Sequence, residues 1–348
     1  MSEWPAPDHA SPYFCHGPTL ISFSGGRTSA YMLYMVLCAH GGVLPDYVHV
    51  VFANTGKERE ETLRFVHECS VRWNVPVIWL EWRGRSGAEI RFEQVGLNSA
   101  SRNGEPLRAL FRSKSYLPNA VMRFCTAEAK IETMKLYMMS IGYERWTNMV
   151  GLRLDERKRL MKQVLRNMEN KERWKSSCPL ALGGVIKRHV MRFWLGRNRF
   201  GTDRRYPLPQ GFDLGLDDHE GNCDGCFLKG FHVLAHIERQ RPGTLDWWIE
   251  AEAEVTAMVG KSSGANFTTE YSYAEIKAYA ESSAELPDIS ATEIGDCTTG
   301  CAVEDGAEEV DDGALAWLLA QIVKEHPMPL PKMKLAPAVG DLFASIAA

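Results

Sequence analysis

Short runs of β-branched and aromatic residues alternate with amphipathic segments through the N-terminal half of the chain. The runs predict four buried strands, at residues 19–23, 47–53, 75–82 and 146–150. Segments between them have the apolar spacing of helices, at residues 30–39, 60–73 and 130–141. Strands that alternate with helices form a parallel sheet with helices on both faces. The pattern therefore predicts an α/β, Rossmann-like fold.

This regular pattern fails over residues 83–118, which are rich in Arg, Ser and Gly. A long stretch of this kind predicts a loop or lid over a site. A helix is expected again at residues 245–258, followed by an acidic stretch at residues 281–312 and a Pro-rich tail. We therefore expect an α/β domain over residues 1–232 and a helical, partly irregular C-terminal region over residues 233–348.

The composition is that of an ordinary soluble protein, with 45% hydrophobic and 24% charged residues. No apolar run approaches the roughly 18 residues that a membrane helix needs, and the N-terminus lacks the pattern of a secretory signal. The nine cysteines are an odd number and widely scattered, which argues against a disulfide framework. We expect a cytoplasmic protein without a membrane partner.

Basic residues are concentrated in two stretches, although the formal net charge is -4. Residues 83–123 contain eight Lys or Arg against three Asp or Glu, and residues 153–205 contain sixteen against five. Residues 281–312 contain eleven acidic residues and no Lys or Arg. Basic stretches of this kind favour an anionic partner, and solvated helix faces produce the same pattern.

The segment after the first predicted strand has the composition of a phosphate-binding turn. Gly25 and Gly26 permit positive φ angles and a close approach of an anion to the backbone N–H groups. The helix that follows adds the positive end of its dipole. Hydroxyl and guanidinium donors flank the glycines, namely Ser24, Arg27, Thr28 and Ser29. An ordinary tight turn between a strand and a helix also uses two glycines.

These residues resemble the PP-loop of the adenine-nucleotide α-hydrolase superfamily, in its branch similar to phosphoadenosine phosphosulfate (PAPS) reductase. Four further motifs in the same order carry the resemblance: FANTGKE at 52–58, RFCT at 123–126 with Lys130, GLRLDE at 151–156 and NCDGC at 222–226. Together the motifs span about 60% of the chain, residues 20–230. One departure is Thr28, because many ATP-cleaving members carry Asp there. The resemblance implies an adenine nucleotide α-hydrolase-like fold.

The resemblance also assigns roles to residues at the carboxyl ends of the predicted strands, where such sheets bind ligands. It implies that the nucleotide is bound by Ser22, Ser24, Gly25, Gly26, Arg27, Thr28, Ser29, Asn54, Thr55, Gly151 and Arg153. It implies catalytic roles for Lys130, Arg153 and Asp155. Arg153 is suited to bidentate contact with a phosphate, and the alternative is a surface ion pair with Asp155 or Glu156.

Cys223 and Cys226 form a C-x-x-C motif, a spacing that indicates metal or redox use in a reducing compartment. Similar family members hold a [4Fe–4S] cluster at these positions together with Cys125. The fourth ligand is expected to be Cys301, with Cys297, Cys178 or an open iron position as alternatives. Structural zinc, a disulfide and plain thiols also agree with the spacing.

Three functions agree with the motifs. The first is an ATP pyrophosphatase that adenylates a substrate for sulfur transfer, as in tRNA thiolation or DNA phosphorothioation, with Mg²⁺ and a sulfur-donor protein as partners. The second is a reductase of PAPS or adenylyl sulfate (APS), although the segment at 297–302 lacks the cysteine motif of such reductases. The third is a non-catalytic nucleotide-binding subunit. The basic stretches favour tRNA or DNA as substrate and agree also with a sulfonucleotide.

Overall fold

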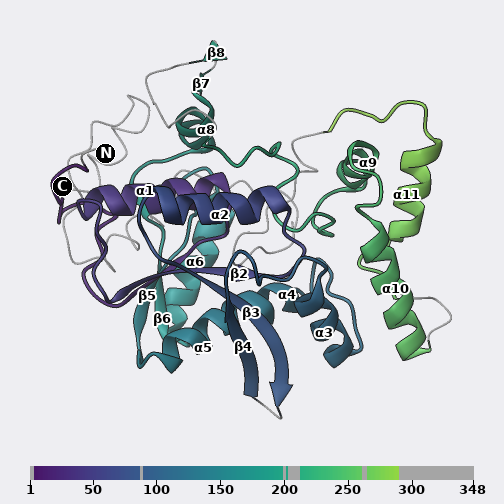
Figure 1. Cartoon of the computed structure of the whole chain (residues 1–348), viewed down its shortest axis with the longest axis horizontal. Helices are drawn as coiled ribbons and strands as arrows, with labels where there is room; N and C mark the ends of the chain where they lie inside the picture. The colour runs from purple at the N-terminus through teal and green to yellow at the C-terminus, as the bar shows by residue number, and fades with distance from the viewer. Residues whose placement is uncertain (1–3, 87–88, 199–200, 203–211, 261–264, 290–348) are drawn as a thin grey trace.

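β1 (Thr19–Ser22) lies inside a six-stranded sheet whose strands follow the order β4-β3-β2-β1-β5-β6 (Figure 1). The computed structural model describes residues 4–86, 89–198, 201–202, 212–260 and 265–289. The other strands of the sheet are β2 (Val48–Asn54), β3 (Val77–Ser86), β4 (Glu89–Val95), β5 (Trp146–Met149) and β6 (Trp174–Ser177). All neighbours pair in parallel except β4, which runs antiparallel to β3.

Helices cover both faces of this sheet, which confirms the predicted α/β, Rossmann-like fold. α1 (Arg27–Ala39) and α2 (Glu60–Arg72) lie on one face, and α5 (Thr133–Ser140) and α6 (Arg157–Glu169) lie on the other (Figure 1). The remaining helices before residue 200 are α3 (Glu105–Lys114), α4 (Phe124–Thr126), the π-helix η1 (Ala127–Glu132), α7 (Pro179–Leu182) and α8 (Lys187–Leu195). A short hairpin of β7 (Arg197–Asn198) and β8 (Gly201–Thr202) follows α8.

The hydrophobic periodicity of the sequence located the strands that are buried from both faces and the helices that cover them. Every residue of β1 is buried, and Ile21 and Phe23 are fully enclosed together with Leu33 and Leu37 of α1. The four predicted strands correspond to β1, β2, β3 and β5, and the predicted helices to α1, α2 and the η1–α5 segment. β3 extends beyond the predicted end to Ser86.

The expectation of a long loop over residues 83–118 is wrong. The described residues of this interval form the end of β3, the edge strand β4 and helix α3. The Arg and Ser residues that concealed the pattern belong to an edge of the sheet that is wet on one side, where ion pairs replace apolar alternation. Arg83, for example, lies 2.6 Å from Glu81 and 2.7 Å from Glu93 of the neighbouring strand.

The C-terminal helices pack around a second hydrophobic cluster. They are α9 (Phe231–Gln240), α10 (Asp246–Val259), which confirms the helix expected at 245–258, and α11 (Tyr273–Ser282). They lie beyond α3 in Figure 1, and Leu107 and Phe111 of α3 share their cluster. Arg108 of α3 also pairs with Glu250 of α10 at 3.0 Å. The acidic stretch is described only to residue 289, and Cys297, Cys301 and the Pro-rich tail lie outside the described residues.

Among the helices that the structure describes, none combines the length and the apolar character needed to cross a membrane.

Glu252 ties α10 to the segment that leads into α11. Its carboxylate accepts hydrogen bonds from the backbone N–H groups of Phe267 (3.1 Å) and Tyr273 (2.9 Å). Burial raises the pKa of this carboxyl from 4.5 to about 7, against the opposing effect of the two N–H donors. The folded protein therefore keeps a proton between about pH 4.5 and 7 that the unfolded chain has lost.

We predict that the free energy of unfolding contributed by Glu252 is fully present below pH 4.5 and is lost as the pH rises through about 7. Replacing Glu252→Gln should reduce the slope of the free energy of unfolding against pH in that window. The reduction corresponds to up to one proton, or about 1.4 kcal/mol per pH unit. Urea denaturation between pH 5 and 8 measures the slope, with Glu250→Gln on the same helix as control. An unchanged slope in the Glu252 variant would contradict the prediction.

Candidate functional site

The turn between β1 and α1 is fixed by the packing of its first glycine. Gly25 has a φ of +76°, and a Cβ atom there would lie 2.7 Å from Thr62 and 2.9 Å from Val66 of α2. Gly26 has an ordinary φ of -94°, and a Cβ atom would meet only the Ser24 hydroxyl, at 3.7 Å. The fold therefore requires glycine at position 25, whereas the glycine at position 26 leaves space on the open side of the turn.

The start of α1 is open to an anion. The helix has no side-chain N-cap and no acidic residue in its first turn. Ser24 and Ser29 bond to one another through their hydroxyls at 2.9 Å, and the Ser29 hydroxyl donates to the Gly26 carbonyl at 3.0 Å. Ser29 is buried, so it shapes the turn from within. The free N–H groups of the turn and the helix dipole then combine at one point.

A cleft of about 250 Å³ opens in front of this turn. One wall is the turn itself, together with Gly151 and Arg153, which follow β5. The opposite wall comes from α8 and from the segment before the C-x-x-C motif, through Lys187, Val190, Met191, Leu214, Asp217, Asp218, Gly221 and Asn222. The cleft therefore lies at the carboxyl ends of β1 and β5, the adjacent strands from which the sheet order runs in opposite directions.

Arg27 is already neutralised by a carboxylate. Its guanidinium makes two hydrogen bonds to Asp213, of 2.8 and 2.7 Å. Burial acts to raise the pKa of Asp213, but hydrogen bonds from Arg27 and the Gly215 N–H outweigh it and leave this pKa below its ordinary value. The Arg27 side chain thus links the segment at Asp213 to the turn, while its backbone remains part of the turn.

Arg153 combines the two roles that the sequence left open. It donates a hydrogen bond of 3.2 Å to the hydroxyl of Thr28, which also lines the cleft. It also contacts Asp155 at 3.0 Å and Glu156 at 3.4 Å. Asp155 does not line the cleft, and it accepts a hydrogen bond from the Lys187 N–H at the start of α8. Asp155 is therefore placed to position Arg153 and α8.

Ser22, Asn54 and Thr55 do not line this cleft. The Ser22 hydroxyl bonds to Asn148 on the opposite face of the sheet. Asn54 is fully buried, and its amide donates to Glu81 and to the Ser101 carbonyl. The Thr55 hydroxyl donates to Glu58 at 2.7 Å. The polar groups of these three residues therefore hold the strand ends together.

Lys130 also lies away from the cleft lining, 3.5 Å from Glu58. Glu58 in turn forms an isolated β-bridge with Cys223, and Cys223 Sγ lies 3.4 Å from the Thr55 hydroxyl. The C-x-x-C loop is therefore docked on the end of β2. Lys130 belongs to this contact.

The C-x-x-C loop is folded around a buried lysine. The Lys229 ammonium donates to the carbonyls of Glu220 (3.3 Å), Cys223 (3.0 Å) and Asp224 (3.3 Å). Burial lowers the pKa of Lys229 to about 8, and the nearby Cys226 acts in the opposite direction. A cation beneath two thiols stabilises their anionic form, which metal binding and thiolate chemistry both use.

Three of the predicted metal ligands share one part of the fold. Cys223 and Cys226 are buried in the cluster of the C-terminal helices, and Cys125 packs against it. Cys178 lies in a different cluster, and burial raises its pKa to about 12. Within the described residues, no group of three His, Cys, Asp or Glu side chains is arranged to hold a metal ion. Cys301, the expected fourth ligand of the [4Fe–4S] cluster, lies outside the described residues.

The far wall of the cleft could not be predicted from the motifs. Asp217 and Asp218, which line this wall, and Asp213, which binds Arg27 beside it, carry no motif; the acidic doublet shortly before the C-x-x-C motif is the one signal of this segment. α8 was also missed, because its apolar positions are interrupted by basic residues.

Comparison with known proteins finds a family match that includes the turn between β1 and α1. Residues 18–182 match the model of the phosphoadenosine phosphosulfate reductase domain. The chain is 28% identical over 217 residues to the uncharacterized nin region protein ORF290 of Escherichia phage lambda. That match covers 60% of this chain and 66% of the phage protein, just under two thirds of its length. No solved structure matches the chain significantly.

We predict that Gly26→Val abolishes nucleotide binding and leaves stability unchanged, because a side chain at this position meets open space and blocks the approach of an anion. Gly25→Val should instead lower the thermal unfolding temperature, because it clashes with Thr62 and Val66. Calorimetric titration with ATP and PAPS, together with thermal denaturation, separates the two effects. A folded Gly26 variant with unchanged affinity for both nucleotides would show that the turn is only structural.

Proposed function

Because residues 18–182 belong to the phosphoadenosine phosphosulfate reductase domain family, we propose that this chain is an enzyme that acts at the α-phosphate of an adenine nucleotide. The observation that carries the proposal is the uncapped start of α1, which faces a cleft together with Gly26 and Arg153. An N-terminus without a side-chain cap binds phosphate through its N–H groups and dipole.

The reaction that the cleft supports best is ATP-dependent adenylation. An acceptor oxygen attacks the α-phosphate, the bond between the α- and β-phosphates breaks, and pyrophosphate leaves. A sulfur nucleophile then displaces AMP from the adenylated acceptor. The N–H groups of the turn are suited to hold the negative charge that collects on pyrophosphate, and Arg153 to orient the α-phosphate.

Carboxylates on the far wall favour ATP over a sulfonucleotide. Asp217 and Asp218 line the cleft opposite the turn, and Lys187 pairs with Asp218 at 2.8 Å. Acidic groups repel a bare triphosphate, whereas Mg²⁺ is bound by one or two carboxylates together with substrate phosphates. When bound, Mg²⁺ would supply the charge that neutralises the phosphates.

The reductase of PAPS or APS is the second candidate, because the matching domain family is described by that activity. It predicts the release of sulfite and needs a nucleophilic thiol. The cysteines at 297 and 301, the tail residues available for that role, lie outside the described residues and lack the expected motif.

Under anaerobic conditions we predict release of pyrophosphate and AMP from Mg·ATP in the presence of tRNA or DNA and a persulfide donor. Arg153→Ala should slow this release by about 100-fold, because one charged donor to the reacting phosphate is lost. Arg91→Ala, on the opposite edge of the sheet, serves as the matched control and should have no effect. Sulfite from PAPS or APS would identify the reductase, and tight ATP binding without turnover would identify a non-catalytic subunit.

We also propose that Cys125, Cys223 and Cys226 bind one iron–sulfur cluster together with Cys301. Iron, zinc and acid-labile sulfide should be measured in protein purified anaerobically, before and after Cys226→Ser. Iron and sulfide that are lost in the variant support a cluster. Stoichiometric zinc, or no metal in either protein, would contradict it. Cys69→Ser, in a buried helical position remote from this set, is the control.

A further inference from the structure

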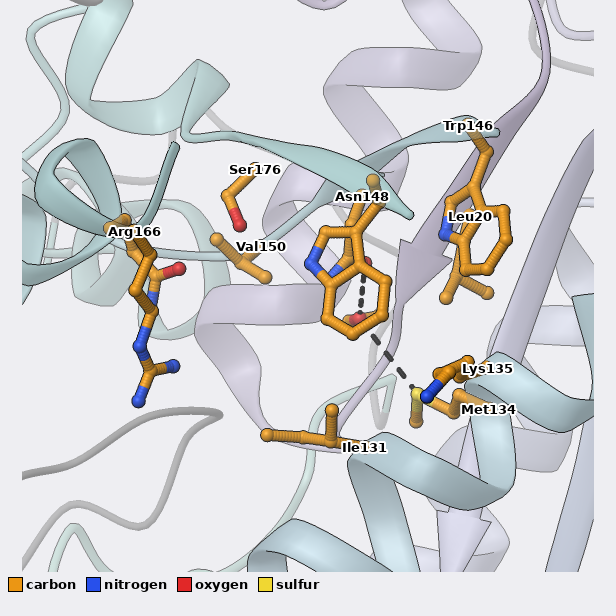
Figure 2. Close-up of a pocket in the computed structure, with 12 residues that line it drawn as sticks. Leu20, Ile131, Met134, Lys135, Trp146, Asn148, Val150, Arg166 and Ser176 are labelled. Carbon is orange, nitrogen blue, oxygen red and sulfur yellow. Dashed lines mark hydrogen bonds between the residues drawn. The ribbon is translucent and has the colours of Figure 1, made fainter. Parts of the chain in front are cut away.

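A groove lies between α5 and α6 on the sheet face opposite α1 (Figure 2). It runs over β1, β5 and the edge strand β6, and its volume is about 30 Å³. Its aromatic and polar lining includes Lys135, Trp146, Asn148, Arg166, Trp174 and Ser176. Nothing in the proposed reaction uses these side chains.

The groove presents a buried donor that lacks an acceptor. The Trp146 ring is only 5% exposed, and its Nε1–H has no hydrogen-bond partner in the part of the chain that the structure describes. The ring nitrogen lies on the side of the ring that faces the other lining residues (Figure 2). Nearby, Asn148 accepts a hydrogen bond from Ser22 at 2.8 Å, which leaves its amide nitrogen as a donor. The groove is therefore complementary to a ligand that carries hydrogen-bond acceptors.

The surface around the groove is basic. Residues 157–177, which span α6 and the edge strand β6, contain eight Lys or Arg and two Glu. Lys162, Arg166 and Arg173 form no ion pair with any residue that the structure describes. A phosphate backbone is the partner that such a surface favours.

The other basic stretch differs in this respect. Six of the eight Lys or Arg in residues 83–123 pair with carboxylates of neighbouring elements, namely Arg83, Arg85, Arg102, Arg108, Arg112 and Lys114. Local pairing therefore accounts for most of that stretch, whereas Lys162, Arg166 and Arg173 keep their charge for a partner.

We propose that the face formed by α6 and β6 binds a single-stranded segment of nucleic acid, whose phosphates lie on Lys162, Arg166 and Arg173. One base stacks against the outer face of Trp174, whose other face stacks on Trp146 with ring centroids 5.6 Å apart, and a carbonyl oxygen of the bound strand enters the groove toward Trp146 Nε1. The volume of about 30 Å³ suits one carbonyl group rather than a whole base. Trp174 lies on the edge strand and is only partly buried, as a stacking platform requires.

The position of the groove connects this surface with the cleft. Ser22 and Val150 line the groove, and they lie just before Ser24 and Gly151, which line the cleft. Both cavities therefore meet the same two strand ends from opposite faces of the sheet. The inference rests on the proposed function, since it names the acceptor of the adenylation as a nucleotide in an unpaired segment.

Binding of fluorescent oligo(U) and oligo(dT) of about 16 nucleotides, and of a duplex, should be measured by anisotropy across a range of salt concentrations. We expect single strands to bind more tightly than the duplex. Lys162→Gln with Arg166→Gln should reduce the slope of log affinity against log salt by about 1.4, or about 0.7 for each phosphate contact. Trp174→Ala should weaken binding by about 5- to 100-fold. Arg91→Gln, an exposed arginine on the opposite sheet edge, should leave both quantities unchanged.

Trp146→Phe keeps the ring and removes the N–H group, so it should weaken oligo(U) by about fivefold and leave an abasic strand unaffected. Thermal denaturation confirms that each variant is folded. Equal losses in Arg91→Gln, or no single-strand binding by the folded wild type at low salt, would overturn the inference even if ATP is cleaved. Single-strand binding that persists in Gly26→Val, together with an absence of pyrophosphate release by the wild type, would uphold the surface and reject the proposed reaction.

Discussion

The contact between Gly25 and α2 is the constraint on which the site depends. A positive φ at this residue turns the chain sharply at the end of β1, and Thr62 and Val66 exclude any side chain there. The turn is thereby held by the core of the sheet, and the first N–H groups of α1 face the cleft without a cap. A backbone site made in this way needs no reorganisation when a phosphate arrives, which is the condition for electrostatic stabilisation during the reaction.

Paired charges around the cleft determine how it receives an anion. Arg27, Arg153 and Lys187 each contact a carboxylate already, through Asp213, Asp155 and Asp218. A phosphate therefore either replaces a carboxylate as the partner of these cations or enters the cleft together with a cation. The paired cations by themselves attract a phosphate only weakly. The same pairing joins α8 and the far wall to the turn, so that the cleft is a product of segments far apart in the chain.

Sequence periodicity located four of the six strands of the sheet, because strands buried on both faces leave continuous apolar runs such as that of β2. It failed at the solvent-exposed edge strand β4, where ion pairs replace apolar alternation, and it also failed at α3. The motifs located Gly26, Thr28 and Arg153 at the cleft, since local backbone geometry decides their position. They did not reveal Asp217 or Asp218, which reach the cleft only through tertiary packing, nor that Arg27 is engaged with Asp213 and Asn54 with Glu81.

The central claim is that the bond between the α- and β-phosphates is the one that breaks. A single-turnover reaction with ATP labelled at the α-phosphate, with acceptor nucleic acid present, tests this directly. The account predicts label in AMP or in an adenylated acceptor, with unlabelled pyrophosphate released in equal amount. Label that appears in ADP, with release of inorganic phosphate, would contradict it.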